Sequence, residues 1–162
     1  MRGPEDVVNQ ARDGATLKQV KAWMEEAGVT DWLHLCEAAV FMGALDRVDE
    51  WASELTPAQT AVLEMVRIRA ARGVLDETII EAALAVCSSQ DTRDLGLEGR
   101  VRMERGLFRF EQGDHEGARD DLTWAETRLK SVAKASRDHD LTILNKAAFH
   151  LALGEQVMAL QV

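Results

Sequence analysis

Residues 99–129 read GRVRMERGLFRFEQGDHEGARDDLTWAETRL and carry the clearest structural signal in this chain of 162 residues. Apolar residues on both sides of Gly113 recur every three or four positions, which is the spacing of an amphipathic helix. Gly113 stands where glycine commonly ends a helix, and Asp114 begins the next segment. The stretch therefore predicts two helices joined by a tight turn, the second running from Asp114 towards Arg137.

The same arrangement recurs along the chain, because a glycine separates successive helical segments at spacings of 30, 40 and 41 residues. These hinge glycines are Gly43, Gly73, Gly113 and Gly154. Five residues after them stand Val48, Thr78, Ala118 and Ala159, so a short apolar residue follows every hinge except the second. A small residue just after a turn lets two antiparallel helices approach closely. Repetition at such a period is typical of helical-repeat proteins.

Helix starts are well marked early in the chain. Thr16 with Gln19, and Thr56 with Gln59, form capping-box patterns in which each side chain satisfies a free N–H of the first turn. Pro57 is a residue favoured at the first helical position. These signals predict helices that begin directly after Thr16 and Thr56.

Other helix boundaries are predicted from single residues. Thr30 can cap a helix that runs to Gly43, and we expect the helix after Thr56 to end at Gly73. Asp76 and Glu77 favour the positive N-terminal end of a following helix. We expect a polar break at residues 138–140 before the last pair of helices.

The packing positions of residues 99–129 are occupied by Gly106, Gln112-Gly113-Asp114, Ala118, Leu122 and Ala125. In the spacing of these residues the chain resembles the tetratricopeptide repeat family. The first hairpin, expected at residues 30–55, resembles it more loosely, through Trp32, Leu35, Gly43 and Leu55-Thr56-Pro57. The second and fourth hairpins, expected at residues 57–88 and 140–162, match it mainly at Gly73 and Gly154. The 40-residue spacing is similar to longer bacterial variants of the repeat, which occur in signalling and regulatory proteins.

The resemblance implies an all-α fold, an α-solenoid of stacked antiparallel helical hairpins that forms a right-handed superhelix. Neighbouring hairpins would share one continuous core because a single hairpin cannot bury its apolar face alone. Residues 1–29 would form an N-terminal helical hairpin or cap, followed by repeats at 30–162. The expected repeats are 30–55, 57–88, 91–137 and 140–162.

Residues 99–129 also depart from the family, because arginines stand where it has large apolar residues in the first helix. These are Arg102, Arg105 and Arg109. Two interpretations are open. Either the helix is rotated by about one residue, so that Met103, Leu107 and Phe110 form the buried stripe, or it displays a basic face.

Composition excludes several classes of protein. Hydrophobic residues make up 46% and charged residues 29%, which is unlike a disordered tail or a membrane protein. Two prolines and no tyrosine favour helix over sheet. The net charge is −9, and residues 1–60 carry 11 acidic and 5 basic side chains. An acidic surface repels phosphate backbones, so we expect no direct binding to nucleic acid.

The sequence predicts a cytoplasmic protein without a membrane segment. Its N-terminus lacks the apolar region of a secretion signal, and no apolar run approaches the roughly 20 residues that span a bilayer. Cys36 and Cys87 are isolated cysteines in apolar helical stretches, so we expect small buried thiols.

The candidate binding residues form a basic stripe on the first helices of successive hairpins. Arg102, Arg105 and Arg109 share one helical face, and the equivalent positions before other hinge glycines hold Arg69, Lys146 and His150. One interpretation is a basic groove that binds an acidic peptide or a carboxylate ligand through the arginine forks. The other is an ordinary solvated face whose arginines pair with nearby acids, such as Glu98 with Arg102.

Other polar and aromatic residues indicate no further site. The histidines lack metal-ligand spacing, His139 falls in the expected polar break, and Asp120-Asp121 has the appearance of helix-start charge and surface. Trp32 and Trp51 lie in apolar helical phase and are expected to pack within hairpins. No nucleotide-binding or hydrolase motif is present, so we expect no enzyme, no metal and no cofactor.

The sequence therefore favours a protein-interaction scaffold that binds a peptide or partner helix along its concave groove. The alternative is a regulatory sensor domain of a bacterial signalling or transcriptional protein that responds to a peptide or small ligand. Val157, Met158, Leu160 and Val162 would leave the last helix uncapped, so we also expect either a homodimer through this end or a continuation of the chain.

Overall fold

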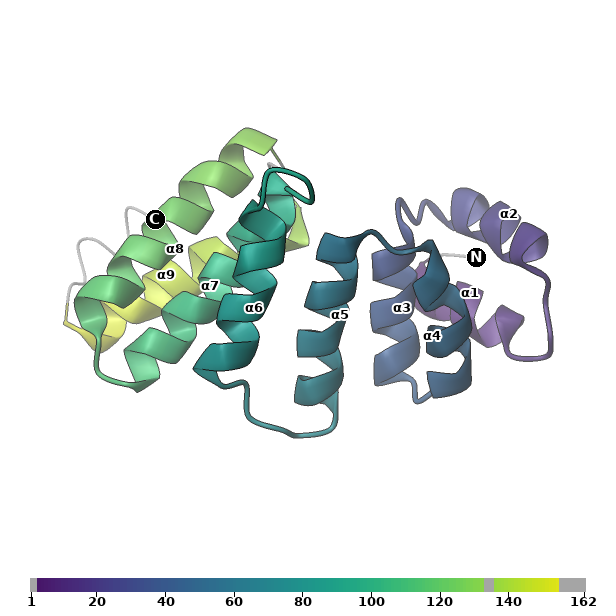
Figure 1. Ribbon diagram of the computed structural model, residues 1–162, viewed down its shortest axis with the longest axis horizontal. Helices are drawn as coiled ribbons and strands as arrows, with labels where there is room; N and C mark the ends of the chain where they lie inside the picture. Colours follow the sequence, from purple (N-terminus) through teal and green to yellow (C-terminus); the bar gives the residue numbers. More distant parts are fainter. Residues whose placement is uncertain (1–2, 133–135, 155–162) are drawn as a thin grey trace. The chain divides into compact units, whose positions relative to one another are not determined.

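The computed structural model describes residues 3–132 and 136–154, and every regular element within these ranges is helical (Figure 1). The described part holds nine α-helices and one short 3₁₀ segment. They are α1 (Pro4–Ala11), α2 (Leu17–Ala27), α3 (Trp32–Phe41), α4 (Leu45–Trp51), η1 (Ala52–Glu54), α5 (Pro57–Ala70), α6 (Glu77–Ser88), α7 (Leu95–Glu111), α8 (His115–Val132) and α9 (Arg137–Ala152). The all-α prediction is confirmed.

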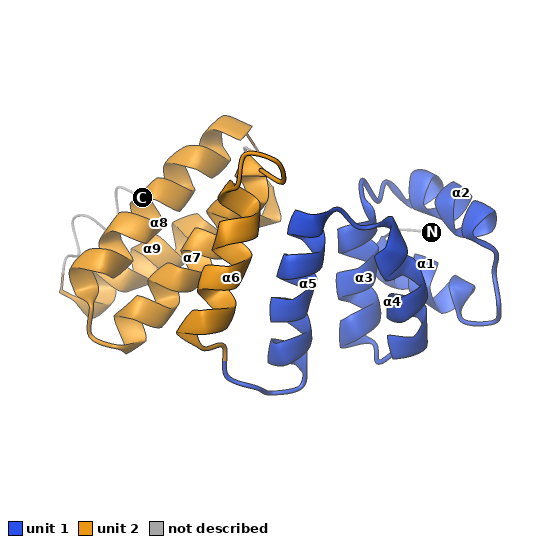
Figure 2. Ribbon diagram, viewed as in Figure 1, with its two compact units in different colours: residues 1–74 blue, residues 75–162 orange. Residues whose placement is uncertain are grey.

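The chain divides into two compact units, Met1–Val74 and Leu75–Val162, shown in different colours in Figure 2. Helices α1 to α5 belong to unit 1, and α6 to α9 belong to unit 2. The boundary lies within residues 57–88, the range expected to form the second repeat.

Unit 1 is organised around α3. Helix α3 packs against α1, α4 and α5, while α1 also packs against α2. Trp51 is fully buried, and its ring lies 6.4 Å from that of the half-buried Trp32. The prediction that these two tryptophans pack within a hairpin is confirmed.

Unit 2 is a sequential stack in which α7 packs against α6 and α8, and α9 packs against α8 and α7. Two glycines of α7 face α8 at close range. A Cβ atom at Gly99 would lie 2.9 Å from Leu129 Cγ, and one at Gly106 would lie 3.1 Å from Leu122 Cγ and 3.3 Å from the Ala118 carbonyl oxygen. The small residues therefore allow the close approach of α7 and α8 that the sequence spacing predicts.

The core of unit 2 is a cluster formed by one face each of α7, α8 and α9. Its buried members are Met103, Ala118, Leu122, Ala125 and Phe149, and the partly buried Phe110, Leu141 and Leu153 pack against it. Met103 and Phe110 therefore lie on the core side of α7, whereas Leu107 is only half-buried. The rotated-helix interpretation is confirmed for Met103 and Phe110.

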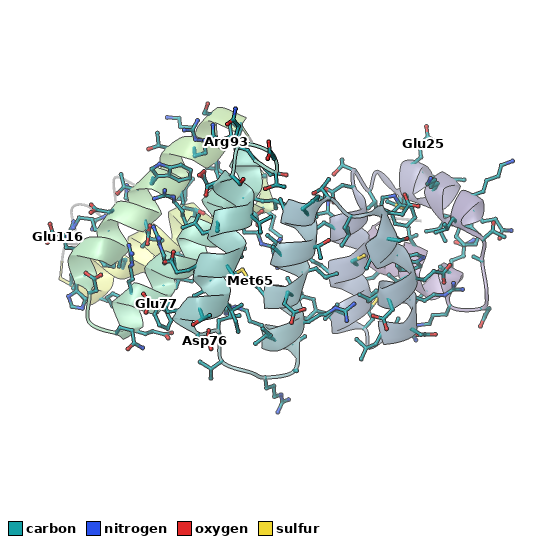
Figure 3. The ribbon with its side chains drawn as sticks, in the orientation of Figure 1. Glu25, Met65, Asp76, Glu77, Arg93 and Glu116 are labelled. Carbon is teal, nitrogen blue, oxygen red and sulfur yellow. The ribbon has the colours of Figure 1, made fainter. Side chains whose placement is uncertain are left out.

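The helix starts largely agree with the sequence signals. Both capping boxes, Thr16 with Gln19 and Thr56 with Gln59, are formed. Asp76 caps α6 by accepting a hydrogen bond from the Ile79 N–H, and Glu77 follows in the first turn (Figure 3). The cap of α3 is Asp31 and not Thr30, because the Asp31 carboxylate accepts from the His34 N–H.

The second hinge differs from the expectation at Gly73. Helix α5 ends at Ala70, and Arg72 takes the left-handed conformation, with a φ of 58°. A Cβ atom at Gly73 would lie 3.0 Å from the Ile68 carbonyl oxygen and from its Cγ2. The glycine is therefore required by a close approach to Ile68, and the left-handed turn falls on its neighbour.

The predicted polar break at residues 138–140 is wrong. These residues lie in the first turn of α9, where the Ser136 hydroxyl caps the helix by accepting from the His139 N–H. Asp138 and Asp140 favour the positive N-terminal end of α9. The acidic residues that suggested a loop therefore belong to the first turn of a helix. The His139 side chain is buried and not solvated.

No described helix combines the length and the apolar character that crossing a bilayer requires. The expectations for Ala159 and for the uncapped residues Val157, Met158, Leu160 and Val162 lie outside the described residues.

Candidate functional site

The arginine stripe of α7 meets a buried carboxylate. Asp121, on the facing side of α8, is 1% exposed, and an uncompensated charge at that depth would be costly. Its two carboxylate oxygens accept three hydrogen bonds of 2.8–2.9 Å from Arg105 and Arg109. Asp121 is therefore the centre of an ion cluster that joins α7 to α8.

Arg105 is the most fully engaged of the three arginines. Its Nε and Nη2 donate to the two oxygens of Asp121, which is the bidentate fork that guanidinium geometry favours. Its Nη1 donates to Glu81 Oε1 of α6 at 3.0 Å. The hydrogen bonds to Asp121 raise the pKa of Arg105 above its ordinary value, with a further contribution from Glu81, while burial acts in the opposite direction. Arg105 thus links α6, α7 and α8.

Arg102 and Arg109 lie at the margins of the cluster and keep exposed surface. The Arg109 side chain is 31% exposed and donates to Asp121 Oδ2 at 2.9 Å. The Arg102 side chain is 27% exposed, and its guanidinium lies 4.2 Å from the centroid of the Trp124 ring. Its Nη1 lies 3.7 Å from Asp121 Oδ1, which is an ion pair but too long for a hydrogen bond.

This arrangement can present positive charge and an aromatic ring to an anionic partner. Three guanidinium groups lie around one buried carboxylate, and the more exposed acids Glu81 and Asp114 balance the other two positive charges, so the positive character is local to the individual arginine side chains. The Arg102 Nε is buried and has no hydrogen-bond partner, so its guanidinium makes fewer bonds than its donors allow. Arg102 and Arg109 are therefore the arginines best placed to bind a further carboxylate.

The other three predicted binding residues, Lys146, His150 and Arg69, lie outside the cluster around Asp121. Lys146 of α9 donates to Glu126 Oε2 of α8 at 2.6 Å. His150 is 1% exposed, and its ring meets the edge of Phe149 at 5.4 Å, so it adds no exposed surface. Arg69 is an exposed residue of α5 and belongs to unit 1, whereas the remaining predicted residues belong to unit 2.

Asp121 lies at the centre of the ion cluster, although its sequence pattern predicted a position on the surface. Its neighbour Asp120 is exposed as expected, but Asp121 is buried. The available signal was helical phase, because Asp121 stands three residues after Ala118 and four before Ala125, on the apolar stripe of α8. Three arginines on the preceding helix provide the charge that such a buried acid requires.

Cys36 and Cys87 are buried and make no contact with the arginine cluster that would activate a thiol. Both thiols are free, as expected, and burial raises the pKa of Cys36 to about 12 and that of Cys87 to about 11. Both are therefore protonated at neutral pH and are poor nucleophiles. Within the described residues, no three His, Cys, Asp or Glu side chains are grouped to hold a metal ion.

Comparison of the chain with protein-family models, with curated proteins and with solved structures found no match. No family is therefore identified.

Proposed function

We propose that this protein is a non-catalytic protein-interaction scaffold that binds an acidic peptide or partner helix, and that its hairpins form the α-solenoid implied by the tetratricopeptide resemblance. Support for the hairpin architecture comes from the close packing of α7 and α8 at Gly99 and Gly106. The sequential packing of α6 to α9 is also what a stack of hairpins requires.

The observation that carries the proposal is the partial exposure of Arg102 and Arg109 around the buried Asp121. Asp121 and Glu81 fix Arg105, and Asp121 also fixes one end of Arg109, so part of the ordering entropy of these long side chains is already lost before a ligand arrives. The guanidinium groups of Arg102 and Arg128 lie 4.2 Å and 5.3 Å from the centroid of the half-buried Trp124 ring, so an aromatic side chain stands among the charges. Such a combination of guanidinium groups and an aromatic ring suits a peptide that carries carboxylates next to an apolar residue.

A peptide selection tests this proposal. A displayed library of random peptides is selected on the immobilised protein, and the recovered peptides are measured by fluorescence anisotropy. We expect enrichment of Asp and Glu, and an affinity that falls as salt is added. Replacing Arg102→Glu and Arg109→Glu together should weaken binding at least tenfold.

Arg93→Glu is the control, because Arg93 is an exposed arginine of unit 2 that precedes α7, and its replacement makes the same change of charge as each of the two replacements taken singly (Figure 3). It should leave the affinity within about twofold. Peptides without acidic enrichment, or equal binding by the double variant and the Arg93→Glu control, would contradict the proposed site.

A further inference from the structure

Unit 1 contains a cavity of about 300 Å³ that is separate from the arginine cluster of unit 2. It lies where the turn between α3 and α4 meets the last turn of α5, and it is lined by Val40, Gly43, Leu45, Arg67, Ala70 and Ala71. Its volume is at the lower end of the range for ligand pockets, about 300–1,000 Å³. The cavity can therefore take one short ligand.

The lining defines the chemistry of that ligand. Five of the six residues are aliphatic or glycine, and the sixth, Arg67, is positively charged. Leu45 is 55% exposed, so the cavity is open to solvent beside an apolar side chain. Aliphatic walls favour an aliphatic group by the hydrophobic effect, and a cation in the lining favours a negatively charged end.

Arg67 is held by a partner that a ligand could replace. Its Nη2 donates to Asp49 Oδ1 at 2.9 Å, but the Asp49 side chain is 71% exposed and the Arg67 side chain 34%. Solvent-exposed pairs of this kind contribute little to stability, so a second carboxylate can displace Asp49 at small cost. The charge of Arg67 also reaches Cys36, one turn before Val40 on α3, where it lowers a thiol pKa that burial otherwise raises. The guanidinium charge therefore acts at the α3–α5 interface and not only in bulk solvent.

We propose that this cavity binds a short aliphatic carboxylate, with the hydrocarbon chain among Val40, Leu45 and Ala70 and the carboxylate on Arg67. This site goes beyond the proposed peptide-binding function, and it is carried by residues of unit 1 alone. Its ligand is a small molecule and not a protein segment.

The test follows the methyl NMR signals of Val40 and Leu45 during titration with butanoate, pentanoate, hexanoate and octanoate. We expect saturable shifts confined to unit 1. Each methylene that enters the cavity should raise the affinity about fourfold, until the cavity is full and the gain stops. 1-Hexanol, which has the same number of carbon atoms without the charge, should bind at least tenfold more weakly than hexanoate.

Three variants locate the site. Ala70→Leu fills the cavity and should abolish binding. Arg67→Met removes the charge but keeps most of the aliphatic part of the side chain, so the affinity for hexanoate should fall to that for hexanol. Asp49→Asn removes the competing carboxylate and should strengthen hexanoate binding several-fold. Glu25→Gln, an exposed position on α2 that makes the same change of charge, should leave it unchanged (Figure 3).

Several results would overturn the proposal. If hexanol binds as tightly as hexanoate, Arg67 does not bind the carboxylate. If a folded Ala70→Leu protein binds hexanoate with full affinity, the ligand does not occupy this cavity. Binding of a dipeptide ending in leucine without any binding of hexanoate would assign the cavity to peptides instead. If Ala70→Leu fails to fold, the comparison of hexanoate with hexanol on the unchanged protein and on Arg67→Met still decides. None of these variants touches Arg102 or Arg109, so this proposal and the peptide-binding proposal can fail separately.

Discussion

Replacing Asp121 with alanine should destabilise unit 2 far more than any surface change on the same helix. The substitution removes three hydrogen bonds of 2.8–2.9 Å and leaves the charges of Arg105 and Arg109 without their shared acceptor. Breaking a buried ion pair by removing one partner costs about 3–5 kcal/mol. Arg105 keeps Glu81, and Arg109 is 31% exposed and can turn to solvent, so we expect about 3 kcal/mol. That is a large fraction of the total stability of a typical domain, about 5–15 kcal/mol.

The assay must report on unit 2 separately from unit 1. Trp124 is the single tryptophan of residues 75–162, so a fluorine label on tryptophan gives one resonance that follows this unit during urea denaturation. A Trp124→Phe protein assigns the resonance. The free energy of unfolding is then compared between Asp121→Ala and the unchanged chain.

Asp120→Ala is the matched control, because it removes the same charge from the adjacent, exposed position of α8. It should change the free energy of unfolding by no more than about 0.5 kcal/mol. The double variant Asp121→Leu with Arg105→Met removes the buried carboxylate together with its main partner and should recover part of the loss seen with Asp121→Ala. A typical substitution changes the free energy of unfolding by about 1 kcal/mol. If the losses caused by Asp121→Ala and by Asp120→Ala differ by no more than about this amount, the ion cluster does not hold α7 to α8.

Further predictions concern helix packing, the thiols and a helix cap. Gly99→Ala should destabilise unit 2 by about 1–3 kcal/mol, because its Cβ would lie 2.9 Å from Leu129 Cγ. Gly96→Ala in the same helix has its nearest atom at 3.7 Å and should be neutral or stabilise by up to about 1 kcal/mol; equal effects in denaturation curves would refute the close approach. The folded protein should resist alkylation at pH 8 while the unfolded chain reacts, as followed by mass spectrometry, since burial raises the pKa of Cys36 to about 12 and of Cys87 to about 11. Because the folded-state pKa of Cys36 lies above the ordinary value of 9.0, its contribution to stability is complete below pH 9.0 and is lost as the pH rises towards about 12; a Cys36→Ala protein with the same alkaline loss would contradict this assignment. Thr56→Ala should cost about 1 kcal/mol in thermal or chemical denaturation through loss of the α5 cap, and no loss would mean that the capping box adds nothing.

Local signals in the sequence predict much of the fold. The capping boxes at Thr16 and Thr56 mark helix starts because their hydrogen bonds lie within one turn. Ala118, the small residue five positions after Gly113, predicts the close pairing of α7 and α8 because a small residue permits that approach, and Gly106 faces it across the two helices. The acidic residues at 138–140 led to the wrong prediction of a break because aspartate is common both in polar loops and in the first turn of a helix.

The candidate site is less predictable, since its geometry depends on residues from three helices. Helical spacing places Arg102, Arg105 and Arg109 on one face but does not show that Asp121 and Glu81 lie opposite them. His150 shares its distance from a hinge glycine with Arg109, yet His150 is buried and Arg109 is partly exposed. Equivalent positions relative to a turn therefore do not ensure equivalent exposure, because the packing of α9 against α7 and α8 differs from that of α7.

The most direct test of the proposed interaction site observes the arginine side chains themselves. The Nε–Hε NMR signals of Arg102, Arg109 and Arg93 are followed while a peptide of alternating glutamate and leucine is added. The proposal predicts saturable shifts at Arg102 and Arg109 and no shift at Arg93. Unchanged signals at Arg102 and Arg109, or shifts of the same size at all three arginines, would show that these two residues form no specific site for an acidic partner.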